Sequence, residues 1–242
     1  MMYMDPLYLM VSAVGLAISG LAAWRVKSAF SKYSRVRSRR GLTGAQAAAL
    51  MLSREGLADV RIERVGGWLS DHYDPSGRVI RLSPQVYDKD SLAAVSVACH
   101  EAGHALQHQQ AYAPLALRSL AVPLASVGGG LGPILCFLGI LLGAGAEAAG
   151  DGLGLWLVKA GLLLFGSVAA FQLVTLPVEF NASARAKVAM ASDGVLADEA
   201  EAAGARRMLR AAAMTYVAAL VTTVLWLLYY AARAGLLGGR RP

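Results

Sequence analysis

The sequence predicts a mainly α-helical membrane protein with about four transmembrane helices and a small α+β domain that contains a short β-hairpin or meander. Of the 242 residues, 56% are hydrophobic, a larger share than an ordinary soluble domain carries. Four apolar stretches each reach about 20 residues, which is enough to span a hydrocarbon core about 30 Å thick. A polar segment with an alternating hydrophobic pattern separates the first stretch from the second, and it accounts for the α+β part of the prediction.

The first membrane helix is expected within residues 1–24, because residues 4–24 are apolar apart from Asp5 and a few small polar residues. Basic residues follow this stretch, whereas they precede the apolar core of a cleaved signal peptide. No acidic residue interrupts the basic run, so the positive-inside rule places this end of the helix in the cytoplasm. The chain has a net charge of +7. Because the basic run lies beside an apolar stretch, we expect these charges to face a membrane surface and not nucleic acid. The basic residues are Arg25, Lys27, Lys32, Arg35, Arg37, Arg39 and Arg40.

Residues 25–117 are expected to form a cytoplasmic α+β region that begins with a short helix. Thr43, followed three residues later by Gln46, has the pattern of a capping box and predicts the start of this helix. Gly56 is suited to the left-handed conformation that ends many helices. We therefore expect the helix to continue to about Arg54.

The middle of this region predicts a small β-structure and a second helix. Alternation between hydrophobic and polar residues predicts strands at 68–73 and 78–82, joined by the turn-forming residues 74–77. A proline after the second strand ends it. Asp90 or Ser91 can then cap a helix that we expect at 92–110.

Residues 118–176 are expected to form a transmembrane hairpin, with apolar spans at 120–142 and 153–176. The linker between the spans carries Glu147 and Asp151 but no Lys or Arg. A loop outside the cytoplasm has this composition, so the hairpin is expected to return the chain to the cytoplasmic side.

Residues 177–210 are polar again and are predicted to form a cytoplasmic helical segment. A fourth span follows at 211–232, and a tail occupies residues 233–242. Three arginines of the tail would lie outside the cell in this topology, which conflicts with the charge rule, so the orientation of the last span stays open. These residues are Arg233, Arg240 and Arg241.

A metal-binding motif lies in the second half of the helix expected at 92–110. His100-Glu101-Ala102-Gly103-His104 fits the pattern H-E-x-x-H. Histidines four residues apart project from one face of a helix about 6 Å apart, close enough to bind one zinc ion. Glu101 lies beside the open coordination position, where it can accept a proton from the attacking water and pass it to the leaving amine. The motif therefore predicts a zincin-like catalytic region with one Zn²⁺ per chain.

A catalytic zinc usually has three protein ligands, and three residues are candidates for the third. His108 extends the histidine series, but it lies about 12 Å along the helix axis from His100, too far to share one ion. His72 lies on a predicted strand and is a candidate for the cleft or, less directly, for ligation. Glu179 is the preferred ligand, because it follows the third span at Pro177 and two spans separate it from the motif, which places both on the same membrane face. The alternative for Glu179 is a first-turn carboxylate that the helix dipole favours.

Six blocks of sequence carry a family resemblance, at residues 32–34, 41–44, 71–75, 100–108, 112–115 and 176–183. In these blocks the chain resembles the YugP-type neutral zinc metallopeptidases of bacterial membranes, which are similar to the HtpX membrane proteases. The resemblance implies a gluzincin-like site in the bacterial inner membrane. Gluzincin-type membrane proteases place their third ligand in the pattern E-x-x-A-D-x-x-A, which Glu179, Ala182 and Ala186 match.

One position departs from that pattern. Ser183 stands where the HtpX-like pattern has Asp, and a carboxylate there would orient a zinc-binding histidine. A serine can form a hydrogen bond but brings no charge. Asn181 and Arg185 are candidates for the surrounding polar network, and either is a candidate to stabilise the oxyanion of the tetrahedral intermediate.

These observations predict a membrane-embedded, zinc-dependent endopeptidase that acts on membrane or membrane-proximal proteins at the cytoplasmic face. The expected partners are the lipid bilayer and a polypeptide substrate, with no nucleic acid, and the oligomeric state is left open. One alternative is a zinc-containing, catalytically weak membrane scaffold or adaptor. Another is a transporter component, which needs ionisable residues that face a cavity inside the membrane. Only Lys159 comes close, at a depth from which it can extend toward the headgroups.

Overall fold

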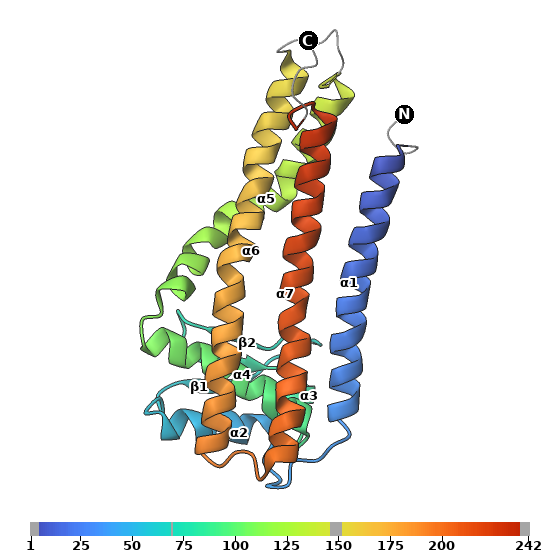
Figure 1. Ribbon diagram of the computed structural model, residues 1–242. Helices are drawn as coiled ribbons and strands as arrows, with labels where there is room; N and C mark the ends of the chain where they lie inside the picture. The colour runs from blue at the N-terminus through green and yellow to red at the C-terminus, as the bar shows by residue number, and fades with distance from the viewer. Residues whose placement is uncertain (1–4, 69, 146–151, 238–242) are drawn as a thin grey trace. The chain divides into compact units, whose positions relative to one another are not determined.

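The computed structural model describes residues 5–68, 70–145 and 152–237 (Figure 1). The chain divides into two compact units. One unit comprises Met1–Leu21, Ala116–Thr175 and Tyr216–Pro242, and we call it the membrane unit. The other comprises Ala22–Leu115 and Leu176–Thr215, and we call it the site unit. The expected linker acids Glu147 and Asp151 and the tail arginines Arg240 and Arg241 lie outside the described residues.

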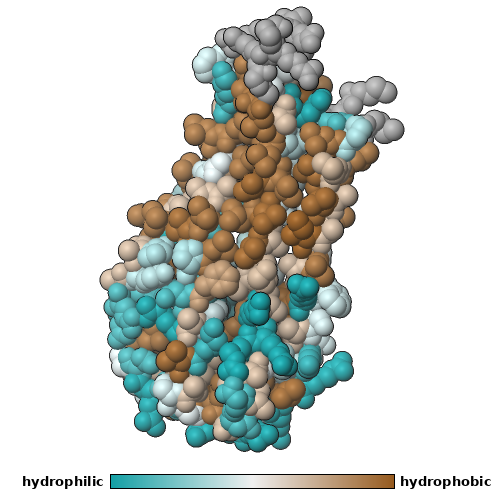
Figure 2. Space-filling view, in the orientation of Figure 1, coloured by the Kyte–Doolittle hydropathy of each residue, from teal (hydrophilic) through white to brown (hydrophobic). Residues whose placement is uncertain are grey.

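Among the described residues, four helices are long and apolar enough to cross a membrane, as the sequence predicts. They are α1 (Pro6–Tyr33), α5 (Ala113–Leu141), α6 (Leu153–Ser192) and α7 (Glu199–Arg233). Many of their large apolar side chains are exposed to the surroundings, among them Leu16, Leu120 and Leu163. Figure 2 shows hydrophobic residues gathered over the long helices on the visible face. In a soluble protein such a surface would be a liability, whereas the bilayer is its natural solvent.

The expectation that a new helix begins at Pro177 is wrong, although the expected segment 177–210 lies within the stretch Leu176–Thr215 of the site unit. Pro177 does not begin a new helix but lies inside α6, which continues to Ser192, and α7 then starts at Glu199. A proline removes one backbone donor and crowds the preceding turn. A long helix tolerates this loss where its neighbours support it, so a proline at the end of an apolar span is an uncertain boundary.

Glycines let helices α5 and α6 approach closely within the membrane unit. A Cβ atom added at Gly139 would lie 2.4 Å from the carbonyl oxygen of Gly154, and one added at Gly161 would lie 2.7 Å from the sulfur of Cys136. Gly132 meets the backbone of Phe165 in the same way. Small residues at helix crossings are typical of membrane proteins, because packing replaces the hydrophobic effect as the force that joins the helices.

The site unit adds short elements between α1 and α5. Helix α2 (Gly44–Arg54) starts at the predicted capping box, in which the side chains of Thr43 and Gln46 each bind the other's backbone N–H. Gly56, just after the helix, has a positive φ of 76°. Helices α3 (Pro84–Tyr87) and α4 (Leu92–Gln109) follow, and Ser91 caps α4.

A three-stranded sheet of order β1-β3-β2 completes the site unit. Strands β2 (His72–Asp74) and β3 (Val79–Leu82) form the predicted antiparallel hairpin, although β2 is shorter than expected. Strand β1 (Arg61–Arg64) pairs with β3 in parallel. In the hairpin turn, Asp74 accepts hydrogen bonds from the backbone N–H groups of Ser76 and Gly77, and the bond from Gly77 contributes most to lowering the pKa of the Asp74 carboxyl.

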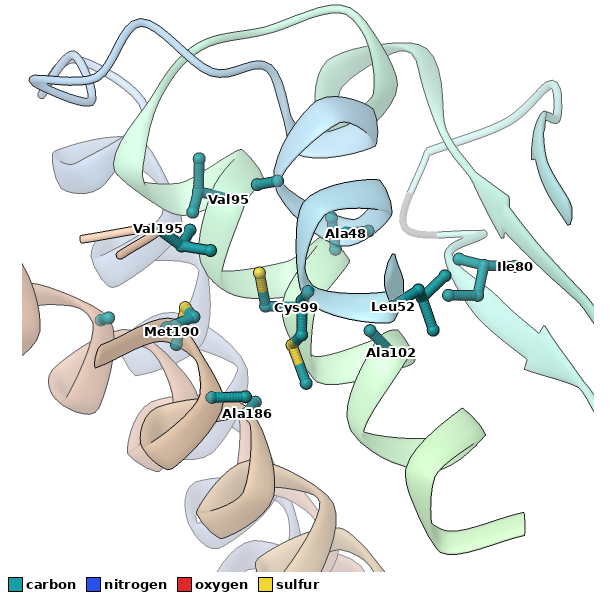
Figure 3. Close-up of a cluster of buried hydrophobic side chains, with 14 of the residues drawn as sticks. Ala48, Leu52, Ile80, Val95, Cys99, Ala102, Ala186, Met190 and Val195 are labelled. Carbon is teal, nitrogen blue, oxygen red and sulfur yellow. The ribbon is translucent and has the colours of Figure 1, made fainter. Parts of the chain in front are cut away.

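The apolar core of the site unit joins elements that are distant in the sequence (Figure 3). Ala48 and Leu52 of α2 and Ile80 of β3 pack on the same cluster as residues of α4 and α6. Residues of α4 and α6 belong to this same cluster, so hydrophobic burial holds the motif helix against the segment that follows Pro177. They include Val95, Cys99 and Ala102 of α4 and Ala186 and Met190 of α6.

Candidate metal centre

The H-E-x-x-H motif lies on α4 where this helix approaches α6 closely. A Cβ atom added at Gly103 would lie 2.5 Å from the carbonyl oxygen of Ala182. Any side chain at position 103 would therefore push the two helices apart. The glycine inside the motif brings the histidine face of α4 next to the turn of α6 that carries Glu179.

His100, His104 and Glu179 form one group of potential ligands, and each offers an atom that lies within 4.8 Å of the others. Nε2 of His100 is 3.2 Å from Oε2 of Glu179, and Nε2 of His104 is 3.7 Å from Oε1. The side chain of Glu179 is 3% exposed and that of His104 is 8% exposed. A carboxylate this deeply buried needs a cationic partner, because an unpaired buried charge is costly.

Both imidazoles are held through their other nitrogen. The hydroxyl group of Ser183 lies 3.2 Å from Nδ1 of His100, and Oε1 of Gln107 lies 2.9 Å from Nδ1 of His104. Metal-binding histidines commonly donate this second N–H to a protein oxygen, which fixes the tautomer and the ring orientation. With both Nδ1 atoms engaged, both Nε2 atoms are left to face Glu179. Ser183 therefore lies where it can orient His100, at the position where the HtpX-like pattern has Asp. It does so as a neutral hydroxyl group and not as a carboxylate.

Gln107 was missed by the sequence analysis, and it organises the polar surroundings of His104. Its side chain is fully buried, and its Nε2 donates to the carbonyl oxygen of Val178 and to Oδ1 of Asn181. These two acceptors determine which end of the amide carries oxygen, so Oε1 must face His104 and accept its Nδ1–H. A lone Gln three residues after the second motif histidine is the only sequence signal that could have indicated this role.

Asn181 and Arg185, both candidates for the polar network, are in it. Oδ1 of Asn181 accepts from Gln107 and also from Nε of Arg185, at 2.6 Å. Arg185 continues through Nη1 to the side chain of Gln110 and lies over the ring of Tyr112. The guanidinium group is thus committed to other partners, and a direct part of Arg185 in oxyanion stabilisation stays a prediction.

Glu101 lies beside the ligand group, and its carboxylate is held by a strand. Oε2 of Glu101 accepts a hydrogen bond of 3.0 Å from the backbone N–H of Tyr73 in β2. The residue is 8% exposed. This contact fixes one carboxylate oxygen and leaves the other for a proton acceptor function.

The two remaining histidines lie outside the ligand group. Nδ1 of His108 is 2.8 Å from the hydroxyl oxygen of Tyr73. His72 is exposed on β2, and its Nδ1 donates to the carbonyl oxygen of Ser70. Among the described residues, neither joins the group formed by His100, His104 and Glu179.

The charges around His104 favour a cation. Burial disfavours the charged imidazolium and so lowers the pKa of His104, but the hydrogen bond and charge of Glu179, together with the charge of Glu101, outweigh it and leave the pKa raised. The neighbouring thiol of Cys99 behaves differently, because burial raises its pKa strongly. Cys99 is therefore a protonated core residue and not a thiolate ligand.

The donor set fits a zinc ion. Two imidazole nitrogens and one carboxylate are among the ligand sets of catalytic zinc sites, which keep a further position for water or substrate. The convergence of both Nε2 atoms on one buried carboxylate, with both Nδ1 atoms hydrogen-bonded, is the arrangement that such a set requires. The assignment of these residues as ligands stays a prediction that the geometry supports.

Comparison with known proteins gives the family. Residues 8–235 match the family described as "Putative neutral zinc metallopeptidase". The chain is 44% identical over 224 residues to "Putative membrane protease YugP" of Bacillus subtilis (strain 168), and the alignment covers 93% of this chain and 95% of that protein. No solved structure shows a significant match. Because the family match includes the motif helix, α6 and all four apolar helices, the chain belongs to this family of neutral zinc metallopeptidases.

Proposed function

We propose that the protein is a membrane-embedded, zinc-dependent endopeptidase that hydrolyses peptide bonds of membrane or membrane-proximal proteins at the cytoplasmic face of the bacterial inner membrane. One observation carries the proposal. Three potential ligand atoms from α4 and α6 lie within 4.8 Å of one another, and the side chain that follows the first histidine is a buried carboxylate. The name of the relative, "Putative membrane protease YugP", supports a protease reaction and a membrane location.

His100, His104 and Glu179 would hold the ion, and Glu101 would act as the general base. A zinc ion in such a site supplies Lewis-acid chemistry, which polarises a peptide carbonyl and makes water nucleophilic at neutral pH. Glu101 takes a proton from the attacking water and later delivers it to the leaving amine. The Tyr73 N–H holds one oxygen of Glu101, so the other oxygen carries the proton between these two positions.

Strand β2 is the element best placed to bind a polypeptide near the ligand group. The sheet order β1-β3-β2 leaves β2 at an edge, and its residue Tyr73 contacts Glu101 directly. A substrate in extended conformation can add to an edge strand through backbone hydrogen bonds, which bind many sequences without strong side-chain preference. His72, exposed on this strand, is then a cleft residue and not a ligand.

Comparison of the wild-type protein with Glu101→Gln tests the reaction. Purified protein in detergent is incubated with an unfolded membrane protein, and fragments are quantified. We expect cleavage by wild type, a loss of at least about 100-fold in Glu101→Gln, because general bases contribute this much, and an unchanged zinc content. Glu55→Gln, the same change on the partly exposed surface, is the matched control and keeps full activity.

Two results would contradict the proposal. Equal cleavage by wild type and Glu101→Gln would exclude Glu101 as the base. Cellular function that depends on His100 but not on Glu101 would favour the scaffold alternative, in which the metal is structural.

Labelling of introduced cysteines tests the orientation. The two native cysteines are buried and should stay silent. A cysteine at position 148, in the linker after α5, is expected to react with an impermeant reagent outside intact cells. One at position 53, on the exposed face of α2, should react only after lysis. The reverse pattern would place the site outside the cytoplasm.

A further inference from the structure

A basic pocket of about 560 Å³ lies between the end of α6 and the start of α7 in the site unit. Four cationic side chains line it, and no acidic residue does. Its volume is in the range of small-ligand sites in proteins. The cations are Lys187 of α6 and Arg206, Arg207 and Arg210 of α7.

The positive charges of this pocket are mostly left without protein partners. Arg206 pairs with Glu199, which lies in the first turn of α7 and is itself exposed. Lys187, Arg207 and Arg210 form no ion pair or hydrogen bond with any residue that the structure describes. Arg210 is three residues from Arg207 and four from Arg206, spacings at which like charges repel on a helix. The grouping is thus unfavourable by itself, and a bound anion would offset the repulsion.

The other lining residues indicate what kind of anion fits. Leu209 and Ala213 of α7 and Phe180 of α6 give the pocket an apolar side. Phe180 is 46% exposed, and α7 becomes apolar from residue 211 onward. The pocket therefore lies where a helix changes from basic to membrane-spanning composition, which is the level of the lipid headgroups.

We propose that this pocket binds the headgroup of an anionic phospholipid. Guanidinium groups bind phosphate through paired hydrogen bonds, and basic pockets beside transmembrane helices are known binding places for anionic lipids. A free phosphate would satisfy the arginines but would leave the exposed ring of Phe180 uncovered, whereas the acyl chains of a lipid would cover it.

The pocket is connected to the metal centre through one side chain. Ser183 lines the pocket, and its hydroxyl group contacts Nδ1 of His100. A bound headgroup would therefore lie next to the group that orients a predicted ligand. The binding of lipid does not depend on peptidase activity, so the inference stands or falls separately from the proposed function.

Lipid retention measures the proposal directly. The full chain is placed in nanodiscs of phosphatidylcholine with a minor fraction of phosphatidylglycerol, extracted, and examined by native mass spectrometry. Wild type is expected to retain phosphatidylglycerol selectively. The double variant Arg207→Gln/Arg210→Gln should retain roughly 25-fold less, at roughly fivefold for each basic residue near an anionic headgroup. Zinc content and thermal unfolding in pure phosphatidylcholine verify that this variant folds, and Lys187→Gln, expected to lose roughly fivefold, replaces it if it does not.

The control is Arg35→Gln/Arg54→Gln, which removes the same charge from two exposed arginines outside the pocket. It should retain the lipid within about twofold, since only general surface attraction is lost. Equal loss in both double variants, or no selectivity in wild type, would overturn the proposal. Complete displacement of phosphatidylglycerol by millimolar inorganic phosphate would also overturn it, in favour of a soluble anion.

Discussion

Different interactions hold the helices together in the membrane unit and in the site unit. In the membrane unit, the helices meet at glycines around a small cluster that includes Cys136 and Tyr229. In the site unit, a larger apolar core encloses buried polar groups, among them Glu101, Gln107 and Glu179. Lipid already surrounds apolar side chains, so close contact is what joins membrane helices. Burial from water stabilises the site unit and allows a polar network inside it, provided that each group is hydrogen-bonded.

Both units nevertheless depend on a glycine at a helix crossing. Gly139 allows α5 to meet α6 at Gly154, and Gly103 allows α4 to meet α6 at Ala182. The structural device is the same, but only the second crossing sets the distance between predicted metal ligands. Substitutions at these positions therefore separate packing from metal binding.

Among substitutions that leave the predicted ligands in place, the largest effect on zinc is expected for Gly103→Ala. The added Cβ would clash with the Ala182 carbonyl oxygen at 2.5 Å, so α6 must move and carry Glu179 away from the two histidines. We expect zinc binding to weaken by roughly 100-fold, the upper range for disturbing groups that orient metal ligands. A competition titration with a zinc chelator measures this change. Unchanged affinity would mean that the helices do not approach closely at this point.

A smaller loss is expected for Gln107→Leu. The substitution keeps the volume but removes the acceptor that holds Nδ1 of His104 and leaves the Val178 carbonyl oxygen and Asn181 with one partner fewer. Zinc binding should weaken by roughly tenfold. Gln109→Leu, on the exposed end of the same helix, is the matched control and should bind zinc as wild type does. A control that loses as much would show that Gln107 has no specific orienting role.

No effect on zinc is expected for Gly139→Ala, although its Cβ would lie 2.4 Å from the Gly154 carbonyl oxygen. The substitution should instead destabilise the membrane unit and lower the free energy of unfolding by about 1–3 kcal/mol. Gly130→Ala on the same helix meets nothing within 4 Å and should be neutral or slightly stabilising. Thermal or denaturant unfolding in detergent compares the two. Zinc loss in Gly139→Ala would remove the distinction between the units.

The sequence predicts local features of this fold well. The Thr43 capping box, the β2–β3 hairpin and the four apolar helices all follow from residue types at fixed spacings, which act over a few residues. The continuation of α6 through Pro177 does not follow, because tertiary support overrides the local preference of proline. The parallel pairing of β1 with β3 is also a tertiary feature, which an alternating pattern alone does not distinguish from a meander.

The candidate site likewise has some features that the sequence predicts and others that only the three-dimensional structure reveals. The spacing within the motif and the even number of spans before Glu179 predict that these residues meet, and the structure places them together. The contacts of Gln107 to Val178 and Asn181, the Tyr73 contact to Glu101 and the basic pocket depend on which elements meet, so no spacing rule reveals them. Their discovery requires the approach of β2, α4, α6 and α7 in three dimensions.

Zinc analysis of the purified protein tests the central claim most directly. Wild type and His108→Ala are predicted to contain one zinc ion per chain, whereas Glu179→Ala should contain almost none after dialysis against a weak chelator. Zinc retained in Glu179→Ala but lost in His108→Ala would contradict the proposed ligand set.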